Sequence, residues 1–114
     1  HYDPSRYPDH YVKFLGYGDG SSAIPPYVRI FNKVGDAYGY LTDVSYVVDF
    51  KHNVEYFLAA TLMVNANGIF NDGVYEYDTI GFPFMAHLGQ AVYQYELRRP
   101  RTYPPDLSRF EVND

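Results

Sequence analysis

The fold is decided by residues 27–49, which read YVRIFNKVGDAYGYLTDVSYVVD. Along residues 27–33, alternate side chains would face opposite sides of a strand. One set would pack on a core and the other would be exposed. The packed set is Val28, Ile30 and Asn32, and the exposed set is Tyr27, Arg29, Phe31 and Lys33. This pattern predicts a strand that ends in Lys-Val-Gly, a tight turn between Gly35 and Gly39, and a return strand over residues 43–49.

A third strand is predicted over residues 54–64, a run with one charged residue, at its outer end. Its β-branched and aromatic residues favour a central strand, although its Leu-Ala-Ala-Thr-Leu-Met middle also suits a buried helix. Only residues 50–53 separate this run from the return strand. Strands joined by so short a connection pair in antiparallel fashion.

The last regular element is a predicted helix over residues 78–98. Its apolar positions repeat at helical spacing and are Phe84, Leu88, Ala91, Val92 and Tyr95. Asp78 or Thr79 can cap its start, Pro83 fits its first turn, and Pro100 ends it. Arg98 and Arg99 complement the negative end of the helix dipole.

The two ends of the chain flank this unit. Residues 1–26 form a lead-in with a short helix behind Asp9, carrying Tyr11, Phe14 and Leu15 on one face, and a Gly- and Pro-rich loop over residues 16–26. Residues 99–114 form an extended tail. We therefore predict one α+β domain over residues 1–114, an antiparallel sheet of about three strands with the C-terminal helix packed on one face.

Composition excludes several classes of function. The 114 residues carry a net charge of −5 and no Cys, and their only basic cluster is Arg98, Arg99 and Arg101, so neither nucleic-acid binding nor a thiolate site is predicted. No run reaches the length of about 18 apolar residues that spans a membrane. The glycines at 16–20 lack the preceding strand and following helix of a phosphate loop.

Metal and cofactor binding are not predicted either. The four histidines, His1, His10, His52 and His87, lie far apart in sequence. Asp72, Glu76 and Asp78 miss the spacing of an EF-hand loop. A Ser-His-Asp constellation stays open, and no pair of carboxylates stands out for glycoside hydrolysis.

The strand ending in Lys33-Val34-Gly35, with Gly39 and Asp43 following, resembles the Lys-Thr-Gly strand of the serine β-lactamase and penicillin-binding-protein superfamily, class A β-lactamases in particular. Within it, the chain is similar to a group of secreted bacterial serine hydrolases. Further residues that carry this likeness are Phe70-Asn71-Asp72-Gly73 and Tyr75-Glu76-Tyr77-Asp78. The likeness covers residues 27–97, and the family's Ser-x-x-Lys motif is absent from the chain.

The resemblance implies roles for residues 33–36. Lys33 would sit beside the nucleophile, and the backbone N–H of Asp36 would be one oxyanion-hole donor. Gly35 would let neighbouring parts of the site approach the backbone. Val34 replaces a Thr or Ser whose hydroxyl would bind the carboxylate of a β-lactam, which favours esterase, amidase or peptidase chemistry. Asp43 would be a supporting or turn residue near the start of the return strand.

By this resemblance the chain is the C-terminal part of a secreted or periplasmic hydrolase and inactive without its N-terminal Ser-x-x-Lys part. Its first residue is His1 rather than Met, which suggests that an upstream part was removed. The intact protein would act on a small-molecule or peptide-like substrate, and the exposed sheet would self-associate or pair with the missing part. The 14 tyrosines support an alternative, a non-catalytic module that binds sugars or a partner.

Overall fold

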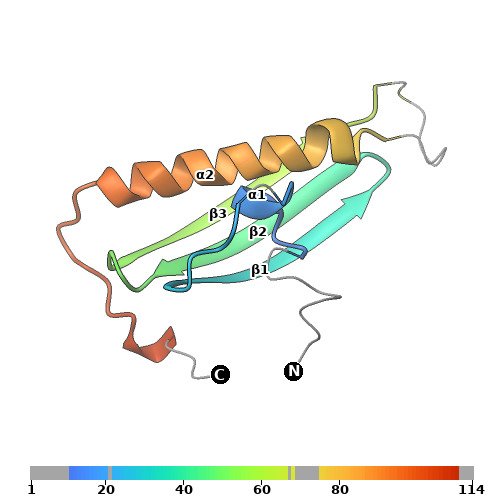
Figure 1. The fold of residues 1–114 in the computed structure, drawn as a ribbon. Helices are drawn as coiled ribbons and strands as arrows, with labels where there is room; N and C mark the ends of the chain where they lie inside the picture. Colours follow the sequence, from blue (N-terminus) through green and yellow to red (C-terminus); the bar gives the residue numbers. More distant parts are fainter. Residues whose placement is uncertain (1–10, 21, 67, 69–74, 111–114) are drawn as a thin grey trace.

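A computed structural model describes residues 11–20, 22–66, 68 and 75–110. Its elements are α1 (Phe14–Tyr17), β1 (Val28–Ala37), β2 (Tyr40–Asp49), β3 (Val54–Met63), the π-helix η1 (Tyr77–Gly81), α2 (Phe82–Arg98) and the 3-10 helix η2 (Ser108–Phe110). The strands form one antiparallel sheet in the order β1-β2-β3, and α2 crosses one face of it (Figure 1). The predicted α+β fold is confirmed, and residues 54–63 are a strand rather than a helix. The prediction that this strand is central is wrong, because β2 lies between β1 and β3 and β3 forms an edge of the sheet.

The turn between β1 and β2 lies later than the sequence pattern predicted. Pairing continues beyond Gly35 to Ala37, which faces Tyr40. The connection is the dipeptide Tyr38-Gly39, whose φ angles are 53° and 89°. Positive φ at both positions matches the type I′ turn, whose twist suits an antiparallel hairpin and lets the ladder run to its ends. The strand therefore does not end at Gly35.

The register divides the sheet into two faces. We call the side under α1 and α2 the helix face and the opposite side the open face. The helix face carries Ile30, Asn32, Val34 and Asp36 of β1, Leu41, Asp43, Ser45 and Val47 of β2, and Tyr56, Leu58, Ala60 and Leu62 of β3. Its centre is the cluster of Leu15, Leu41 and Met85, which are at most 5% exposed. Apolar burial here stabilises the fold.

The N-terminal helix is shorter than predicted. α1 is a single turn from Phe14, so Tyr11 lies outside it, and residues 1–10 are outside the described part. Within that turn Gly16 has a φ of +91°, which breaks the helical pattern. At this point α1 lies directly against Gly89 of α2.

The start of α2 also differs from the prediction. Neither Asp78 nor Thr79 caps the helix, since both lie inside η1, and α2 begins at Phe82 without a side-chain cap. Pro83 does lie in the first turn, as predicted, and α2 ends at Arg98. Of the connection between β3 and η1, residues 67 and 69–74 lie outside the described residues.

The C-terminal tail is packed rather than merely extended. Leu107 is 5% exposed, and Phe110 of η2 contacts the rings of Phe31 and Tyr46 on the open face, with centroids 6.4 Å and 5.2 Å away. Figure 1 shows this segment passing below the sheet, on the side opposite α2. It covers one end of the open face and leaves the hairpin end uncovered among the described residues.

Candidate functional site

The four residues predicted for the site lie in β1, an edge strand, and we call Lys33, Val34, Gly35 and Asp36 the candidate segment. Lys33 and Gly35 belong to the open face, whereas Val34 and Asp36 belong to the helix face. The Lys33 side chain is exposed, and its Nζ donates a hydrogen bond to the Val34 carbonyl oxygen at 2.6 Å. The ammonium group is thus held at the outer edge of the sheet.

The backbone of the candidate segment has a defined direction. A two-residue turn closes the hairpin at Ala37 and Tyr40, and hydrogen-bonded pairs alternate from there, so Asp36 directs its N–H away from β2. The same alternation turns the carbonyl groups of Ile30 and Val34 outward. Ile30 O accepts a hydrogen bond from Lys13 Nζ at 3.1 Å, in agreement with that direction. Asp36 therefore offers an outward N–H of the kind that an oxyanion hole uses.

Gly35 lies beside open space. A Cβ atom built on it meets no atom of the described residues within 4 Å. The close approach that the resemblance implied is therefore absent from the described part of the chain. Val34 is half-buried and faces Asp43 across the strand pair.

A buried hydrogen-bond network supports the candidate segment from the helix face. Asp43 is fully buried, and its two carboxylate oxygens accept from the Asn32 side-chain amide and the Leu15 N–H, each at 3.0 Å. Asn32 also donates to the Val12 carbonyl at 2.8 Å and accepts from Lys13 Nζ. Asp43 is thus a strand residue rather than a turn residue, and the network fixes the backbone next to Lys33.

Burial lowers the pKa of the Lys13 ammonium, and the charge of Asp43 opposes that shift. Sequence reasoning assigned no role to Lys13. It did place Asn32, a polar residue, on the packed face of its strand. A buried amide needs hydrogen-bond partners, so that placement was the available signal for the network.

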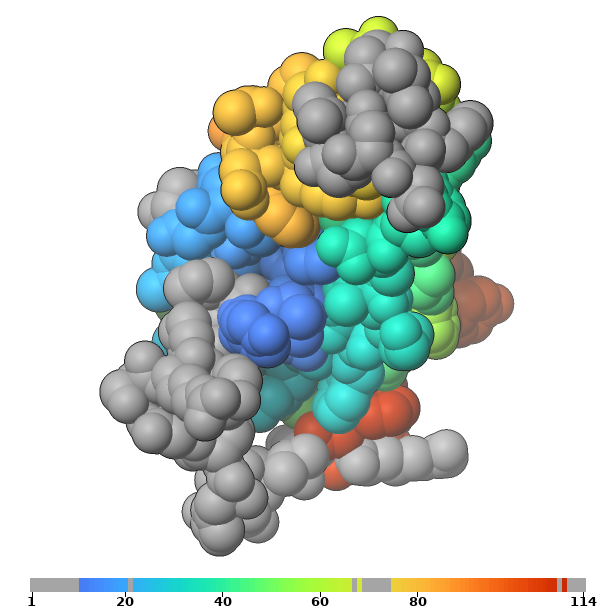
Figure 2. Space-filling model, turned by 90° about the vertical axis from the view of Figure 1, so that its right-hand side faces the viewer, coloured from blue at the N-terminus to red at the C-terminus, as the bar shows by residue number. Residues whose placement is uncertain are grey.

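The turn at the other end of the candidate segment is also held from outside the hairpin. Tyr77 Oη accepts the N–H of Gly39 at 2.9 Å, and the Gly39 carbonyl accepts from the N–H of Val64 at 2.6 Å. A Cβ atom at Gly39 would lie 2.7 Å from Cβ of Asn65, so only glycine fits. Figure 2 shows the hairpin, in teal, at the surface beside the segment around η1, in yellow.

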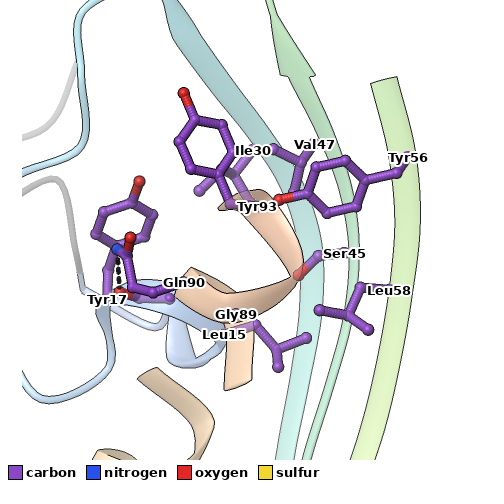
Figure 3. Close-up of a pocket in the computed structure, with 11 residues that line it drawn as sticks. Leu15, Tyr17, Ile30, Ser45, Val47, Tyr56, Leu58, Gly89, Gln90 and Tyr93 are labelled. Atoms are coloured by element: carbon purple, nitrogen blue, oxygen red, sulfur yellow. Dashed lines mark hydrogen bonds between the residues drawn. The ribbon is translucent and has the colours of Figure 1, made fainter. Parts of the chain in front are cut away.

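A small cavity lies under α2, between α1 and the helix face (Figure 3). Its volume is about 10 Å³, which holds at most about one water molecule. Ser45 Oγ is buried in this region and has no hydrogen-bond partner among the residues that the structure describes. The Gln90 amide closes one side by donating to the Gly16 carbonyl at 2.8 Å. The cavity is too small to bind a substrate.

A second polar cluster lies at the far end of β2. The carboxylate of Asp49 is 1% exposed and accepts from the Tyr93 hydroxyl at 2.5 Å, with His52 Nδ1 at 2.8 Å. A Ser-His-Asp triad contains such a histidine and aspartate pair, but no serine hydroxyl of the described residues is hydrogen-bonded to His52. Burial acts to raise the pKa of Asp49, yet the hydrogen bonds from Tyr93 and His52 outweigh it and lower that pKa.

We expect this cluster to make the folded protein less stable as the pH falls. Because the pKa of Asp49 is lower in the folded state than in the unfolded state, its contribution is complete above the unfolded value of about 3.9 and is lost as pH falls through the folded value. In Tyr93→Phe the pKa is lowered less, so urea unfolding from about pH 6 to about pH 2.5 should show a shallower loss of stability than wild type. An identical slope in both proteins would contradict this role.

The open face carries a row of aromatic rings across the three strands. Phe31, Tyr46 and Phe57 stack with centroid distances of 6.3 Å and 4.6 Å and interplanar angles of 26° and 23°. Phe57 is 78% exposed. Tyr46 donates its hydroxyl to Glu55, so the one tyrosine of this row already has a partner.

Two classes of site find no support in the part of the chain that the structure describes. No group of three His, Cys, Asp or Glu residues there could hold a metal ion. No helix of the described residues is long and apolar enough to cross a membrane.

Comparison of the chain with models of protein families, with curated proteins and with solved structures finds no match. The likeness to serine hydrolases therefore depends on the quoted residues and on the geometry of the candidate segment.

Proposed function

We propose that this chain is the C-terminal part of a secreted or periplasmic serine β-lactamase-like hydrolase and contributes one side of its active site. One observation carries the proposal. On the same edge of the sheet, the candidate segment presents the Lys33 ammonium and, by the alternation of the ladder, the outward N–H of Asp36. These are the two groups that the resemblance implies.

Their chemistry suits acyl transfer. Attack of a serine on an ester or amide carbonyl places negative charge on the carbonyl oxygen, and a fixed backbone N–H stabilises that charge without reorganisation. The Asp36 N–H supplies one such donor. Lys33 adds positive charge for the substrate anion and for proton transfer. The nucleophilic serine, its lysine base and the second donor would come from outside these 114 residues.

The same geometry favours a substrate class. Val34 has no hydroxyl to bind the carboxylate of a β-lactam, and its side chain points to the helix face. We therefore propose ester, amide or peptide substrates for the intact enzyme rather than antibiotics. The chain alone should be inactive, because it lacks the nucleophile.

The test is to express the complete reading frame that encodes this chain and treat the product with a fluorophosphonate, which forms a covalent bond with an activated serine. Mass spectrometry should locate the label on the serine of an upstream Ser-x-x-Lys motif. Lys33→Ala should slow labelling by about 100-fold, because it removes electrostatic stabilisation at the reacting group.

Lys51→Ala is the matched control. Lys51 is an exposed lysine in the β2–β3 connection, at the opposite end of the sheet, where its Nζ lies 5.1 Å from the centre of the Tyr27 ring. Its variant should label at the wild-type rate. A complete product without Ser-x-x-Lys, or equal rates for Lys33→Ala and Lys51→Ala, would refute the proposal.

The alternative function, a binding module based on exposed tyrosines, has one supporting observation, the aromatic row of the open face. Stacked rings on an exposed sheet can hold a sugar or another flat ligand. However, two of its three rings are phenylalanines, and Phe110 covers one end of the row. The row therefore favours this function less than the candidate segment favours a hydrolase.

A further inference from the structure

The two edges of the sheet differ in how their backbone groups are protected. At β1, Lys13 and Lys33 donate to the outward carbonyl groups of Ile30 and Val34, and the Asn32 side chain ties the same edge to residue 12. Lysine side chains on an edge strand prevent pairing with another strand. The β1 edge is therefore closed along much of its length.

Within the described part of the chain, the β3 edge shows none of these features. Its ten residues read VEYFLAATLM and include one charge, Glu55, but no lysine and no proline. Hydrogen-bonded and non-hydrogen-bonded pairs alternate along the strands, starting from the Tyr38-Gly39 turn. This alternation points the backbone N–H and C=O groups of Phe57, Ala59 and Thr61 away from β2. Long uncharged edges of this kind are templates for another strand.

The flank of α2 beyond β3 is apolar as well. Phe84 and Tyr95 are 49% and 57% exposed, Leu88 and Ala91 lie between them at helical spacing, and we call these four residues the α2 stripe. On the other flank, Gly89 packs against α1, whose Leu15 N–H bonds to Asp43 of β2 and which directly follows Lys13, bonded to β1. The stripe therefore faces away from α1, on the β3 side, where Leu88 packs with the same core as Leu58.

We propose that a second copy of this chain occupies this surface, with β3 paired to β3 in antiparallel fashion about a two-fold axis. The occupant must bring an uncharged strand and, on the same face of the sheet, an apolar helix flank. This chain carries both. A two-fold axis perpendicular to an antiparallel pair keeps both helices on one face, so the two α2 stripes turn toward each other.

The strand sequence suits a register centred on Ala59. Ala59 then faces its own counterpart, Phe57 faces Thr61, and Glu55 faces Met63, so no two like charges meet. The pairing forms a continuous sheet of six strands, and it does not depend on the hydrolase proposal.

Analytical ultracentrifugation of the 114-residue chain tests the proposal. We expect a dimer with a Kd near or below about 10 μM. Ala59→Pro removes an outward N–H and leaves the bonds to β2 in place, so it should raise that Kd at least about tenfold. Ala59→Thr, which keeps the N–H and suits a strand, should leave the Kd unchanged within about threefold.

A second pair of variants tests the helix flank and does not touch the strand. Tyr95→Lys puts a charge in the α2 stripe and should also raise the Kd at least about tenfold, whereas Gln94→Lys, at the exposed neighbouring position, should not. Circular dichroism of each variant checks that it is folded. A wild-type chain that stays monomeric to about 1 mM would overturn the proposal, and this is the result expected if a different polypeptide covers the β3 edge. A dimer that tolerates both Ala59→Pro and Tyr95→Lys would overturn it too.

Discussion

Gly89→Ala should destabilise the protein by more than about 2 kcal/mol, although alanine is favoured over glycine inside a helix by about 1 kcal/mol. A Cβ atom at this position would lie 2.1 Å from the backbone N of Gly16 and 2.5 Å from the carbonyl carbon of Leu15. Backbone atoms cannot rotate away as a side chain can. α1 would have to move off α2, which would open the core at Leu15.

Urea unfolding at neutral pH measures this effect, and Gly35→Ala is its control. A Cβ atom on Gly35 meets no atom of the described residues, and this glycine is not among those with positive φ, so we expect a change within about 0.5 kcal/mol. If Gly89→Ala proves as stable as wild type, the close contact between α1 and α2 is wrong.

The second large effect is expected at Asp43. Asp43→Ala should lower the free energy of unfolding by about 3 kcal/mol, because the buried Leu15 N–H and the half-buried Asn32 amide would both lose their acceptor. Burial prevents water from replacing the carboxylate easily. The loss should also loosen Lys13, which is bonded to Asn32.

Asp36→Ala provides the comparison, since Asp36 is an exposed aspartate three residues from Lys33. Its variant should change stability by less than about 0.5 kcal/mol. Thermal and urea unfolding of both variants measure the two changes in stability. Equal effects at Asp43 and Asp36 would show that the buried network does not hold the sheet and α1 together.

Much of the fold was predictable because it follows from local patterns. Alternation over residues 27–33 and the glycines that follow located the β1–β2 hairpin, and β-branched and aromatic content located β3. The short connection at residues 50–53 required antiparallel pairing, and apolar spacing located α2. The boundaries were less predictable. The Tyr38-Gly39 turn depends on positive φ at a tyrosine, and η1 displaces the start of α2 from Asp78 to Phe82. Both depend on contacts between segments distant in sequence.

The site was predictable only in part. The sequence identified Lys33 and Asp36, and the structure places both on one edge strand. It did not reveal that Lys13 and Tyr77 contact this strand or its turn, since they lie 20 and 44 residues from Lys33 and no local pattern links them. The chemistry of these residues is a proposal, because the chain contains no Ser-x-x-Lys motif to supply the proposed nucleophile.

The β1–β2 hairpin is held in place by contacts with other parts of the chain. The candidate segment owes its position to groups on three other parts of the chain: Leu15 and Lys13 on one side, Val64 at the turn, and Tyr77 in η1. A peptide cut to residues 27–50 would retain Lys33 and Asp36 but none of these supports. The candidate segment is therefore not a self-contained unit, and grafting it onto another protein would require the surrounding scaffold as well.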